Sequence, residues 1–411
     1  MKKCFSLFLV TIFLFQLLIT ANAKNVTKED ENVTPVFNSA TTSKENSAKQ
    51  KLPVEINAKS AVLMDVTTGK VLLEYNADEK LFPASVTKIM TMLLVMEAIE
   101  EGKISLTDVV VCSENASKKG GSQIWLEPGE EMTVNDLLKA TAIGSANDAA
   151  TLLGEYISGS EEAFITLMNT RAKELGMNNT HFDNATGLDD SSDTHLTTAR
   201  DIGKMSVELM KYDLIQDYTT VWMDSLRNGE TELVNTNKLV RFYSGTTGIK
   251  TGTTSKAGCC VSASAKRDDL HLVAVVMGSA NSSERFETAK TMLNWGFANF
   301  ALAELKIENS AFASVEVIGG ESDTLTPYVK GNTYVLIKKG EEENVKQTVT
   351  LTENVEAPVT KNQKLGSVKF LLSGEVIAEV PLLAPEEIKK LTFSTSFKRM
   401  LNFLACGEKI G

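Results

Sequence analysis

Residues 85–96 read Ser-Val-Thr-Lys-Ile-Met-Thr-Met-Leu-Leu-Val-Met, so a Ser-x-x-Lys sequence opens directly into an apolar run. The run predicts a buried helix that begins near Ser85. Residues three positions apart lie on one face of a helix, so the amine of Lys88 can reach the hydroxyl of Ser85. Free backbone N–H groups at a helix N-terminus also favour a developing oxyanion. These residues therefore place a nucleophile, a base and an electrophilic pocket side by side.

Ser-x-x-Lys by itself is better explained by a Ser N-cap followed by a solvated lysine. Two later sequences change that interpretation. Ser145-Ala-Asn147 interrupts two helical patterns, and Lys250-Thr251-Gly252 begins a strand with small residues. The order Ser-x-x-Lys, Ser-x-Asn, Lys-Thr-Gly is the serine acyl-transfer set of penicillin-binding proteins and β-lactamases.

Two other Ser-x-Asn sequences compete with Ser145 and Asn147. The copy at residues 279–281 follows a strand-like run and comes after Lys-Thr-Gly, so it stands in the wrong order. The copy at residues 113–115 lies in a polar, turn-like segment. Ser145 has the right order and lies at a junction between helices, where side chains can point into a cleft. Ser145 and Asn147 are therefore predicted to belong to the site.

With these motifs the chain resembles the D-alanyl-D-alanine carboxypeptidases, a family of low-molecular-mass penicillin-binding proteins. The likeness extends from about Pro53 to the C-terminus. One departure is Ala146, where many members of the family carry Gly. It adds a methyl group and leaves its neighbours Ser145 and Asn147 in place. Beyond the three motifs, the likeness includes residues 58–65, 82–84, 182–188, Arg285 and 293–297.

The resemblance implies a reaction for the three motifs. Ser85 would attack the carbonyl between the last two D-alanines of a peptidoglycan stem peptide, and water would resolve the acyl-enzyme. Lys88 would take the serine proton as a neutral amine, a state that burial beside the second cation Lys250 favours by lowering its pKa. Ser145 would relay a proton to the leaving D-alanine, and Asn147 would hold the substrate amide.

Substrate binding is assigned by the same resemblance. The backbone N–H groups of Ser85 and Thr253 would form the oxyanion hole, because Gly252 lets the strand approach closely. β-Lactams should acylate Ser85 as well, and the chemistry needs neither a metal nor an organic cofactor. The residues expected to bind the terminal carboxylate are Lys250, Thr251 and Thr253, with Arg285 supporting them at the cleft edge.

The first residues predict an exported protein. Lys2 and Lys3, an apolar run over residues 5–19 and an Ala-Asn-Ala sequence ending at Ala23 form a secretory signal peptide, residues 1–23. A transmembrane anchor fits less well, because the run is short of the about 20 residues that a span needs and contains a glutamine. Residues 24–52 are rich in Asn, Thr, Ser, Lys and Glu, which predicts a flexible linker.

The rest of the sequence predicts an α+β chain with two folded domains. Strand patterns at 60–64 and 71–74, and again at 248–250, 258–265 and 271–277, enclose helical patterns, which indicates one antiparallel sheet covered by helices. By resemblance this catalytic domain, residues 53–303, has the penicillin-recognising transpeptidase/β-lactamase-like fold. Short alternating strands over residues 304–383 predict a small, non-catalytic β-sandwich. The helical patterns lie at 89–99, 134–143, 149–157, 164–175, 199–211 and 284–297.

The last segment, residues 384–411, predicts an amphipathic helix. The stripe alone fits equally well a helix docked on its own domain and a helix lying in an anionic membrane interface. The terminal position and the C-terminal anchoring of the family favour the membrane. We therefore expect the protein at the outer face of the cytoplasmic membrane, in the cell wall space. The apolar stripe consists of Phe393, Phe397, Met400, Leu401 and Leu404.

Acidic residues exceed basic ones, 53 to 42, and the formal net charge of −11 argues against a nucleic-acid partner. No spacing of cysteines or histidines in the sequence indicates a disulfide framework or a zinc site. Among the histidines, His195 is predicted to have a structural or cleft-lining role. His271 alternates with apolar strand residues and is predicted to face solvent.

Two other functions share part of this pattern. A secreted β-lactamase carries the same three motifs, but class A enzymes add Glu-x-x-Leu-Asn, and the Leu-Asn pairs here have Lys290 and Lys398 at the Glu position. The β-domain and the basic tail are also surplus to a β-lactamase. A cell-wall binder or β-lactam sensor that is acylated without turnover is disfavoured by the intact Ser145 and Asn147. Turnover of a D-Ala-D-Ala peptide separates the three functions.

Overall fold

The computed structural model describes residues 52–188, 192–305, 307, 312–331 and 333–406. The predicted signal peptide, residues 1–23, and the predicted linker up to residue 51 lie outside the described residues. In the described part, a domain of mixed helices and strands is followed by a run of strands and one terminal helix. The predicted α+β class is confirmed.

A five-stranded antiparallel sheet forms the centre of the first domain, in the order β2-β1-β9-β8-β7. The sheet joins segments from both ends of the domain, because Val62 on β1 lies opposite Val275 on β9. Both strands are apolar without alternation, as expected for strands covered on both faces. The strands are β1 (Ser60–Asp65), β2 (Val71–Tyr75), β7 (Thr246–Thr254), β8 (Gly258–Arg267) and β9 (Leu270–Ser279).

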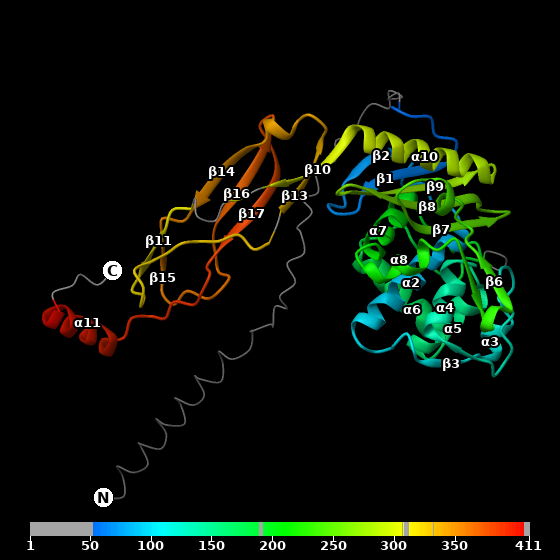
Figure 1. Ribbon diagram of the computed structural model, residues 1–411, viewed down its shortest axis with the longest axis horizontal. Coiled ribbons are helices and arrows are strands. Elements are labelled where there is room, and N and C mark those ends of the chain that lie inside the picture. The colour runs from blue at the N-terminus through cyan, green and yellow to red at the C-terminus, as the bar shows by residue number, and fades with distance from the viewer. Residues whose placement is uncertain (1–51, 189–191, 306, 308–311, 332, 407–411) are drawn as a thin grey trace, which may run out of the picture. The chain divides into compact units, whose positions relative to one another are not determined.

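Helices cover both faces of this sheet (Figure 1). Helix α10 (Ser282–Asn299) packs on one face, where Met292 and Phe297 join the sheet in one apolar cluster. On the other face, α7 (Ala199–Leu209) lies between the sheet and α2 (Lys88–Glu100). Helix α2 is buried along residues 88–96 because it is apolar on all sides. The other long helices are α4 (Val134–Ala142), α5 (Asn147–Ser158) and α6 (Glu161–Glu174).

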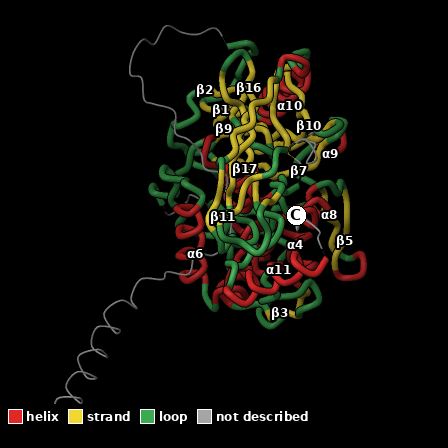
Figure 2. The backbone as a smooth tube through the Cα atoms, turned by 90° about the vertical axis from the view of Figure 1, so that its left-hand side faces the viewer, coloured by secondary structure: helices red, strands yellow, loops and turns green. Residues whose placement is uncertain are grey.

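The sequence pattern does not indicate two short hairpins, because strands of three or four residues show too little alternation. They are formed by β3 (Val109–Val111) with β4 (Glu131–Thr133), and by β5 (Met223–Leu226) with β6 (Thr231–Val234). In Figure 1 and Figure 2 the central sheet lies toward one end of this domain and β3 toward the other, with the helices between them. Single helical turns are η1 (Ala84–Thr87), α3 (Glu114–Ser117), η2 (Asp213–Ile215), α8 (Gln216–Thr219), η3 (Arg227–Gly229) and α9 (Leu239–Phe242).

The two rejected Ser-x-Asn copies have structural contacts. Ser113 is the N-cap of α3, where its hydroxyl accepts a hydrogen bond from the backbone N–H of Ala116 at 2.9 Å. The hydroxyl of Ser279 donates to the carbonyl oxygen of Asn57 at 2.9 Å. Asn281 is the N-cap of α10. Ser113 and Asn281 therefore stabilise helix N-termini, and Ser279 connects β9 to the segment before β1. Ser145 remains the candidate for the serine of the Ser-x-Asn motif.

His271 on β9 is buried, so its predicted solvent-facing position was wrong. Its Nε2 lies 2.9 Å from the hydroxyl oxygen of Thr247 and 2.8 Å from that of Ser264. Burial lowers the pKa of His271 to about 4. The error has a simple cause: a polar residue on a strand faces solvent only where one face of the sheet is open. Here helices cover both faces.

The second domain consists of short strands in three small sheets. β10 pairs with β13, the order β12-β11-β15 forms a second sheet, and β14-β16-β17 forms a third. A β-structure is confirmed for this segment. The elements are β10 (Phe300–Leu305), β11 (Val315–Ile318), β12 (Thr324–Leu325), β13 (Thr333–Lys338), η5 (Glu342–Asn344), β14 (Lys346–Leu351), β15 (Asn354–Glu356), β16 (Lys364–Leu372) and β17 (Glu375–Leu383).

The limits of this domain differ from the predicted 304–383. β10 begins at Phe300, so residue 304 falls inside a strand. After β17 the chain stays on the domain: Ala384 is fully buried and Ile388 is 4 % exposed, in one cluster with Leu365. The backbone N–H of Ile388 also donates to the carbonyl oxygen of Val359. Apolar residues in an extended segment without alternation give no sequence signal for a domain limit. The predicted limit at residue 383 therefore falls before the last buried residues of this domain.

The terminal helix α11 (Phe393–Cys406) therefore begins nine residues later than the predicted segment, which started at residue 384. Its large apolar side chains are exposed, with Phe393 87 % and Leu404 72 % accessible to solvent. Among the described helices, none is both long and apolar enough to span a bilayer. An amphipathic terminal helix is thus observed.

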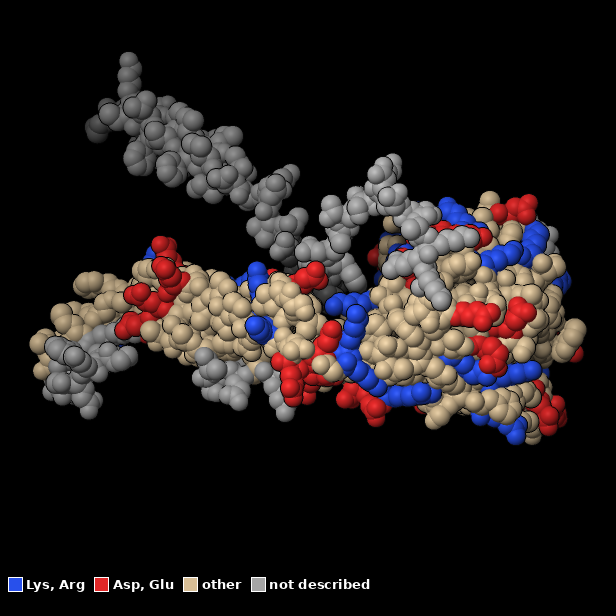
Figure 3. Space-filling view, turned by 90° about the horizontal axis from the view of Figure 1, so that it is seen from above, with Lys and Arg blue, Asp and Glu red and all other residues tan. Residues whose placement is uncertain are grey.

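Charged side chains of both signs are mixed on the surface. On the face drawn in Figure 3, lysine and arginine residues alternate with aspartate and glutamate over the first domain. Within the first domain, Arg200 lies 2.8 Å from a carboxylate oxygen of Glu74 and 2.8 Å from one of Asp78. Such exposed pairs each contribute little to stability. The mixture of both signs leaves no large patch of a single sign on the face of the first domain drawn in Figure 3.

Candidate active site

Ser85 and Lys88 meet at the start of α2, as predicted. The Nζ atom of Lys88 lies 3.1 Å from the Oγ atom of Ser85. Lys88 is fully buried, and Ser85 is partly exposed. Burial, and then the nearby positive charge of Lys250, lower the pKa of Lys88 well below its ordinary value, against the opposing effect of Asp148. The amine is therefore suited to act as a general base.

The Ser-x-Asn segment lies at the N-terminus of α5. Ser145, 4 % exposed, has a φ of +62° and turns the chain between α4 and α5. Asn147 faces Lys88, whose Nζ lies 2.5 Å from its Oδ1 atom. The Nδ2 atom of Asn147 donates to the carbonyl oxygen of Gly120 at 2.6 Å. Asn147 thus connects the Lys88 amine to the backbone at Gly120.

Strand β7 brings Lys250, Thr251 and Gly252 to the same place. Lys250 is 1 % exposed, and burial together with the charge of Arg285 lowers its pKa to about 7. The Thr251 hydroxyl donates to the hydroxyl of Thr236 at 2.7 Å, a partner that the sequence did not indicate. Lys250 is therefore a buried cation that loses its charge close to neutral pH.

Gly252 allows β7 to touch the turn that carries the nucleophile. A Cβ atom at residue 252 would lie 2.8 Å from the carbonyl oxygen of Pro83 and 2.9 Å from the backbone nitrogen of Ser85. The predicted close approach of the strand is confirmed. It brings the backbone of β7 up to the N–H of Ser85, as an oxyanion hole between Ser85 and Thr253 requires.

Arg285 is buried behind β7, and its contacts differ from those expected at a cleft edge. Its Nη1 atom donates to the carbonyl oxygen of Gly252 at 3.0 Å and to the hydroxyl of Thr253 at 2.9 Å. A third contact reaches the carbonyl oxygen of Cys260 at 3.2 Å. Arg285 is 7 % exposed, and its guanidinium therefore holds the end of β7 in place and adds positive charge behind Thr253.

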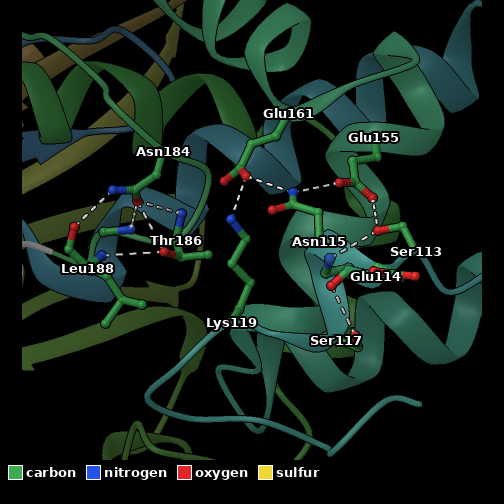
Figure 4. Close-up of polar contacts among 12 residues, drawn as sticks. Ser113, Glu114, Asn115, Ser117, Lys119, Glu155, Glu161, Asn184, Thr186 and Leu188 are labelled. Atoms are coloured by element: carbon green, nitrogen blue, oxygen red, sulfur yellow. Dashed lines mark hydrogen bonds and ion pairs between the residues drawn. The ribbon is translucent and has the colours of Figure 1, made fainter. Parts of the chain in front are cut away.

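Sequence reasoning missed one partner of the base. The Nζ atom of Lys88 donates to the carbonyl oxygen of Thr186 at 2.9 Å. The Thr186 carbonyl belongs to a loop that is organised by Asn184, whose carboxamide lies between Thr186 and Leu188 in Figure 4. A backbone carbonyl has no signature in a sequence. An Asn two residues before a Thr-Gly pair is nevertheless typical of an Asx turn, which could have drawn attention to the loop.

His195 ties this loop to the nucleophile turn. The backbone N–H of Asp183 donates to Nδ1 of His195 at 3.0 Å. The other ring nitrogen, Nε2, therefore carries the hydrogen and donates to the hydroxyl of Thr87 at 2.9 Å. His195 is fully buried, and its Nε2 atom contacts Thr87, which lies between Ser85 and Lys88 in the sequence. The sequence predicted a structural or cleft-lining role, and these two contacts are structural.

Comparison with known proteins shows the family of this chain. The profile of the family described as D-alanyl-D-alanine carboxypeptidase matches residues 44–281. The chain belongs to the D-alanyl-D-alanine carboxypeptidase family. A second profile, described as the C-terminal domain of penicillin-binding protein 5, matches residues 300–390. That match ends near the last buried residues of the β-domain.

Relatives in this family cover almost the whole chain. The D-alanyl-D-alanine carboxypeptidase DacF of Bacillus subtilis is 45% identical over 348 residues, which are 84% of this chain and 89% of the relative. The carboxypeptidase DacC of Escherichia coli is 36% identical over 85% of this chain and 88% of its own length. Such coverage includes both described domains, so the likeness is not confined to the motifs.

Solved structures agree. Penicillin-binding protein 5 from Haemophilus influenzae is 31% identical, covers 82% of this chain and 99% of its own, and superposes with a TM-score of 0.73. Penicillin-binding protein D2 from Listeria monocytogenes, solved in an ampicillin-bound form, is 29% identical over 59% of this chain and 98% of its own, with a TM-score of 0.54. The fold predicted for the first domain is therefore confirmed.

Proposed function

We propose that this chain is a serine-type carboxypeptidase that removes the terminal D-alanine from peptidoglycan stem peptides. The observation that carries the proposal is the buried Lys88, which lies 3.1 Å from the Ser85 hydroxyl and is held by two carbonyl oxygens. Its lowered pKa provides the neutral amine that must take the serine proton. Membership of the carboxypeptidase family supplies the reaction class.

The mechanism proceeds through an acyl-enzyme. Lys88 accepts the proton of Ser85 as Oγ bonds to the carbonyl carbon of the D-Ala-D-Ala peptide bond. The tetrahedral oxyanion is held by the backbone N–H groups of Ser85 and Thr253. The C–N bond then breaks, and the leaving D-alanine nitrogen receives a proton through Ser145. Water then attacks the acyl carbon and loses a proton to the base. The bond between that carbon and Ser85 Oγ breaks, Oγ takes the proton back, and the shortened peptide leaves as a carboxylate.

The substrate is held by its carboxylate and its amide. Lys250 and Thr251 lie on β7 beside the nucleophile, and Arg285 adds charge behind Thr253. We expect Asn147, whose Oδ1 atom lies 2.5 Å from the Lys88 amine, to hold the substrate amide. The amide of a β-lactam resembles the D-Ala-D-Ala bond, so penicillins acylate the same serine. The ampicillin-bound form of the Listeria relative is consistent with such inhibition.

Release of D-alanine tests this function. A fragment of residues 52–392 is incubated with a peptide ending in Lys-D-Ala-D-Ala, and free D-alanine is measured alongside Ser85→Ala. We expect release by the wild-type fragment and none by the variant. Stoichiometric penicillin labelling without release would instead favour a sensor, and rapid penicillin hydrolysis would favour a β-lactamase. Either result would contradict the carboxypeptidase proposal.

We also propose that the enzyme works outside the cytoplasm, in peptidoglycan remodelling that affects cell shape. The predicted signal peptide and linker support export, and the substrate occurs in the cell wall. Sequencing of the mature N-terminus tests the cleavage, which we expect after Ala23. A mature chain that still begins at Met1 would contradict export by this signal.

Membrane attachment through α11 is the last part of the proposal. The stripe of Phe393, Phe397, Met400, Leu401 and Leu404 is exposed along one helix, which suits burial in a lipid interface. The experiment compares the chain from residue 52 to 411 with a fragment ending at Thr392, using sedimentation with phosphatidylglycerol vesicles. We expect only the longer chain to sediment, with equal D-alanine release by both. Sedimentation of the shorter fragment would place the attachment elsewhere.

A further inference from the structure

The Lys88 amine has two carbonyl acceptors besides the serine. Its Nζ atom lies 2.5 Å from Oδ1 of Asn147 and 2.9 Å from the carbonyl oxygen of Thr186. A neutral amine has two N–H groups and one lone pair. When the two N–H groups are donated to these two carbonyl oxygens, the lone pair faces the remaining neighbour, the Ser85 hydroxyl at 3.1 Å. The direction of the Thr186 carbonyl therefore helps to decide where the base points.

Asn184 controls that direction. Its Oδ1 atom accepts hydrogen bonds from the backbone N–H of Gly187 at 2.7 Å, from the N–H of Thr186 at 3.1 Å and from the Thr186 hydroxyl at 3.0 Å. Its Nδ2 atom donates to the carbonyl oxygen of Leu188 at 2.8 Å. Figure 4 shows the carboxamide enclosed by this turn. Both the oxygen and the nitrogen of the Asn184 carboxamide thus form hydrogen bonds with the backbone of one loop.

The geometry of the peptide bond joins these two observations. The Thr186 carbonyl and the Gly187 N–H belong to one planar trans peptide, in which C=O and N–H point in opposite directions. Holding the Gly187 N–H on Asn184 therefore turns the Thr186 carbonyl the other way, toward Lys88. Without that hydrogen bond, the peptide plane can rotate and withdraw the acceptor from the amine.

Other contacts keep the loop against the nucleophile turn independently of Asn184. The Thr91 hydroxyl donates to the carbonyl oxygen of Ala185 at 2.8 Å. Gly187 has a φ of +85°, and a Cβ atom there would lie 1.8 Å from the carbonyl oxygen of Ala84. Asn169 on α6 binds both backbone groups of Phe182, at 3.0 Å and 2.8 Å. Loss of the Asn184 side chain should therefore reorient the peptide between residues 186 and 187, while the rest of the loop keeps its position.

We propose that Asn184 is a positioning residue for the carboxypeptidase reaction: it orients the 186–187 peptide so that the Thr186 carbonyl aims the Lys88 amine at Ser85. The inference rests on the proposed function of this site. It concerns a residue that touches neither the substrate nor the reacting atoms, and it makes the loop part of the machinery that activates the nucleophile.

The test compares Asn184→Ala with Asn184→Asp and with Asn169→Ala as the matched control. The alanine variant loses the acceptor, and we expect its rates of D-alanine release and of Ser85 acylation by a fluorescent penicillin to fall about 10- to 100-fold, as misplacement of a catalytic group does. The aspartate variant keeps the acceptor and should retain most of the activity. Asn169→Ala loosens the same loop at Phe182, and should lower the thermal midpoint while leaving both rates near the wild-type values.

The pH dependence of acylation separates positioning from stability. The charged groups that face Lys88 are Lys250 on β7 and Asp148 on α5, and none of the three variants changes them. A carbonyl acceptor favours the protonated amine, so Asn184→Ala should move the acidic limb of the acylation rate to lower pH. The added carboxylate of Asn184→Asp should move it to higher pH. The control should leave the limb in place.

Three results would overturn the inference. The first is a folded Asn184→Ala variant that is acylated at the wild-type rate with the wild-type acidic limb. The second is an Asn169→Ala variant with the same kinetic losses, which would show that only loop stability matters. The third, decisive if Asn184→Ala does not fold, is an unshifted limb in Asn184→Asp. Absence of D-alanine release by the wild-type chain would instead contradict the proposed function. The role of Asn184 could then still be tested, because the rate of acylation by penicillin does not depend on release of D-alanine.

Discussion

Replacing Gly252 by alanine tests the central contact of the site, between β7 and the turn that carries Ser85. The new Cβ atom would lie 2.8 Å from the Pro83 carbonyl oxygen, 2.9 Å from Cβ of Ala84 and 2.9 Å from the backbone nitrogen of Ser85. Ordinary contact begins at 3.4 Å. Since two of the three neighbours are backbone atoms, the strand itself must move away, by about 0.5 Å.

That movement widens the oxyanion hole. The new methyl group would press against the turn that carries one proposed donor, the N–H of Ser85, and the other donor, the N–H of Thr253, follows it on β7. A donor that is lost completely costs about 100- to 1000-fold in rate. A hydrogen bond lengthened by about 0.5 Å is weakened rather than lost, so we expect acylation of Ser85 to slow by about 10- to 100-fold.

The assay is the second-order rate of acylation by a fluorescent penicillin, together with kcat/KM for D-alanine release. The matched control is Gly203→Ala, whose Cβ atom would lie 2.5 Å from the sulfur of Met64 in the core, away from the nucleophile turn. The control should lower thermal stability, by about 1–3 kcal/mol, and leave the rates unchanged. Wild-type acylation by a folded Gly252→Ala variant would refute the oxyanion hole proposed at this contact.

Further predictions concern pH and the domain limit. Lys250, with its pKa lowered to about 7, is charged below that pH, so kcat/KM for peptides should fall as the pH rises above 7. Lys250→Arg keeps its charge and should flatten this alkaline limb; an unchanged limb would contradict the carboxylate role. The pKa of His271 falls from 6.5 to about 4 on folding, so its neutral form is favoured. Stability should therefore decrease by roughly 3 kcal/mol between pH 6.5 and 4, less so in His271→Gln, as urea unfolding can measure. A chain ending at residue 383 should be less stable than one ending at 392, by about 2–5 kcal/mol, because it lacks the buried Ile388. Equal urea midpoints of the two fragments would instead support the predicted domain limit at residue 383.

The local parts of the site were predictable because they depend on short-range geometry. A helix starting near Ser85 brings Lys88 onto the same face whatever the rest of the chain does. Gly252 predicted a close approach because it has no side chain, although its neighbours were unknown. The same local reasoning found the apolar stripe that begins at Phe393. It also identified the mixed fold, since strand patterns at both ends of a helical segment must pair to bury their apolar faces.

Contacts between distant segments were decided only by the folded chain. The Thr186 carbonyl reaches Lys88 from 98 positions away, through a backbone group that every residue possesses. The burial of His271 depends on helices that cover both faces of its sheet, and the position of Arg285 depends on how α10 packs on β8 and β9. The sequence by itself indicated the proposed nucleophile and base, Ser85 and Lys88, and the chemistry class, because these depend on side chains and their local spacing. The tertiary structure decided the burial of Lys88, the direction of its pKa shift and its hydrogen-bond partners, because burial and long-range hydrogen bonds exist only after the segments have met.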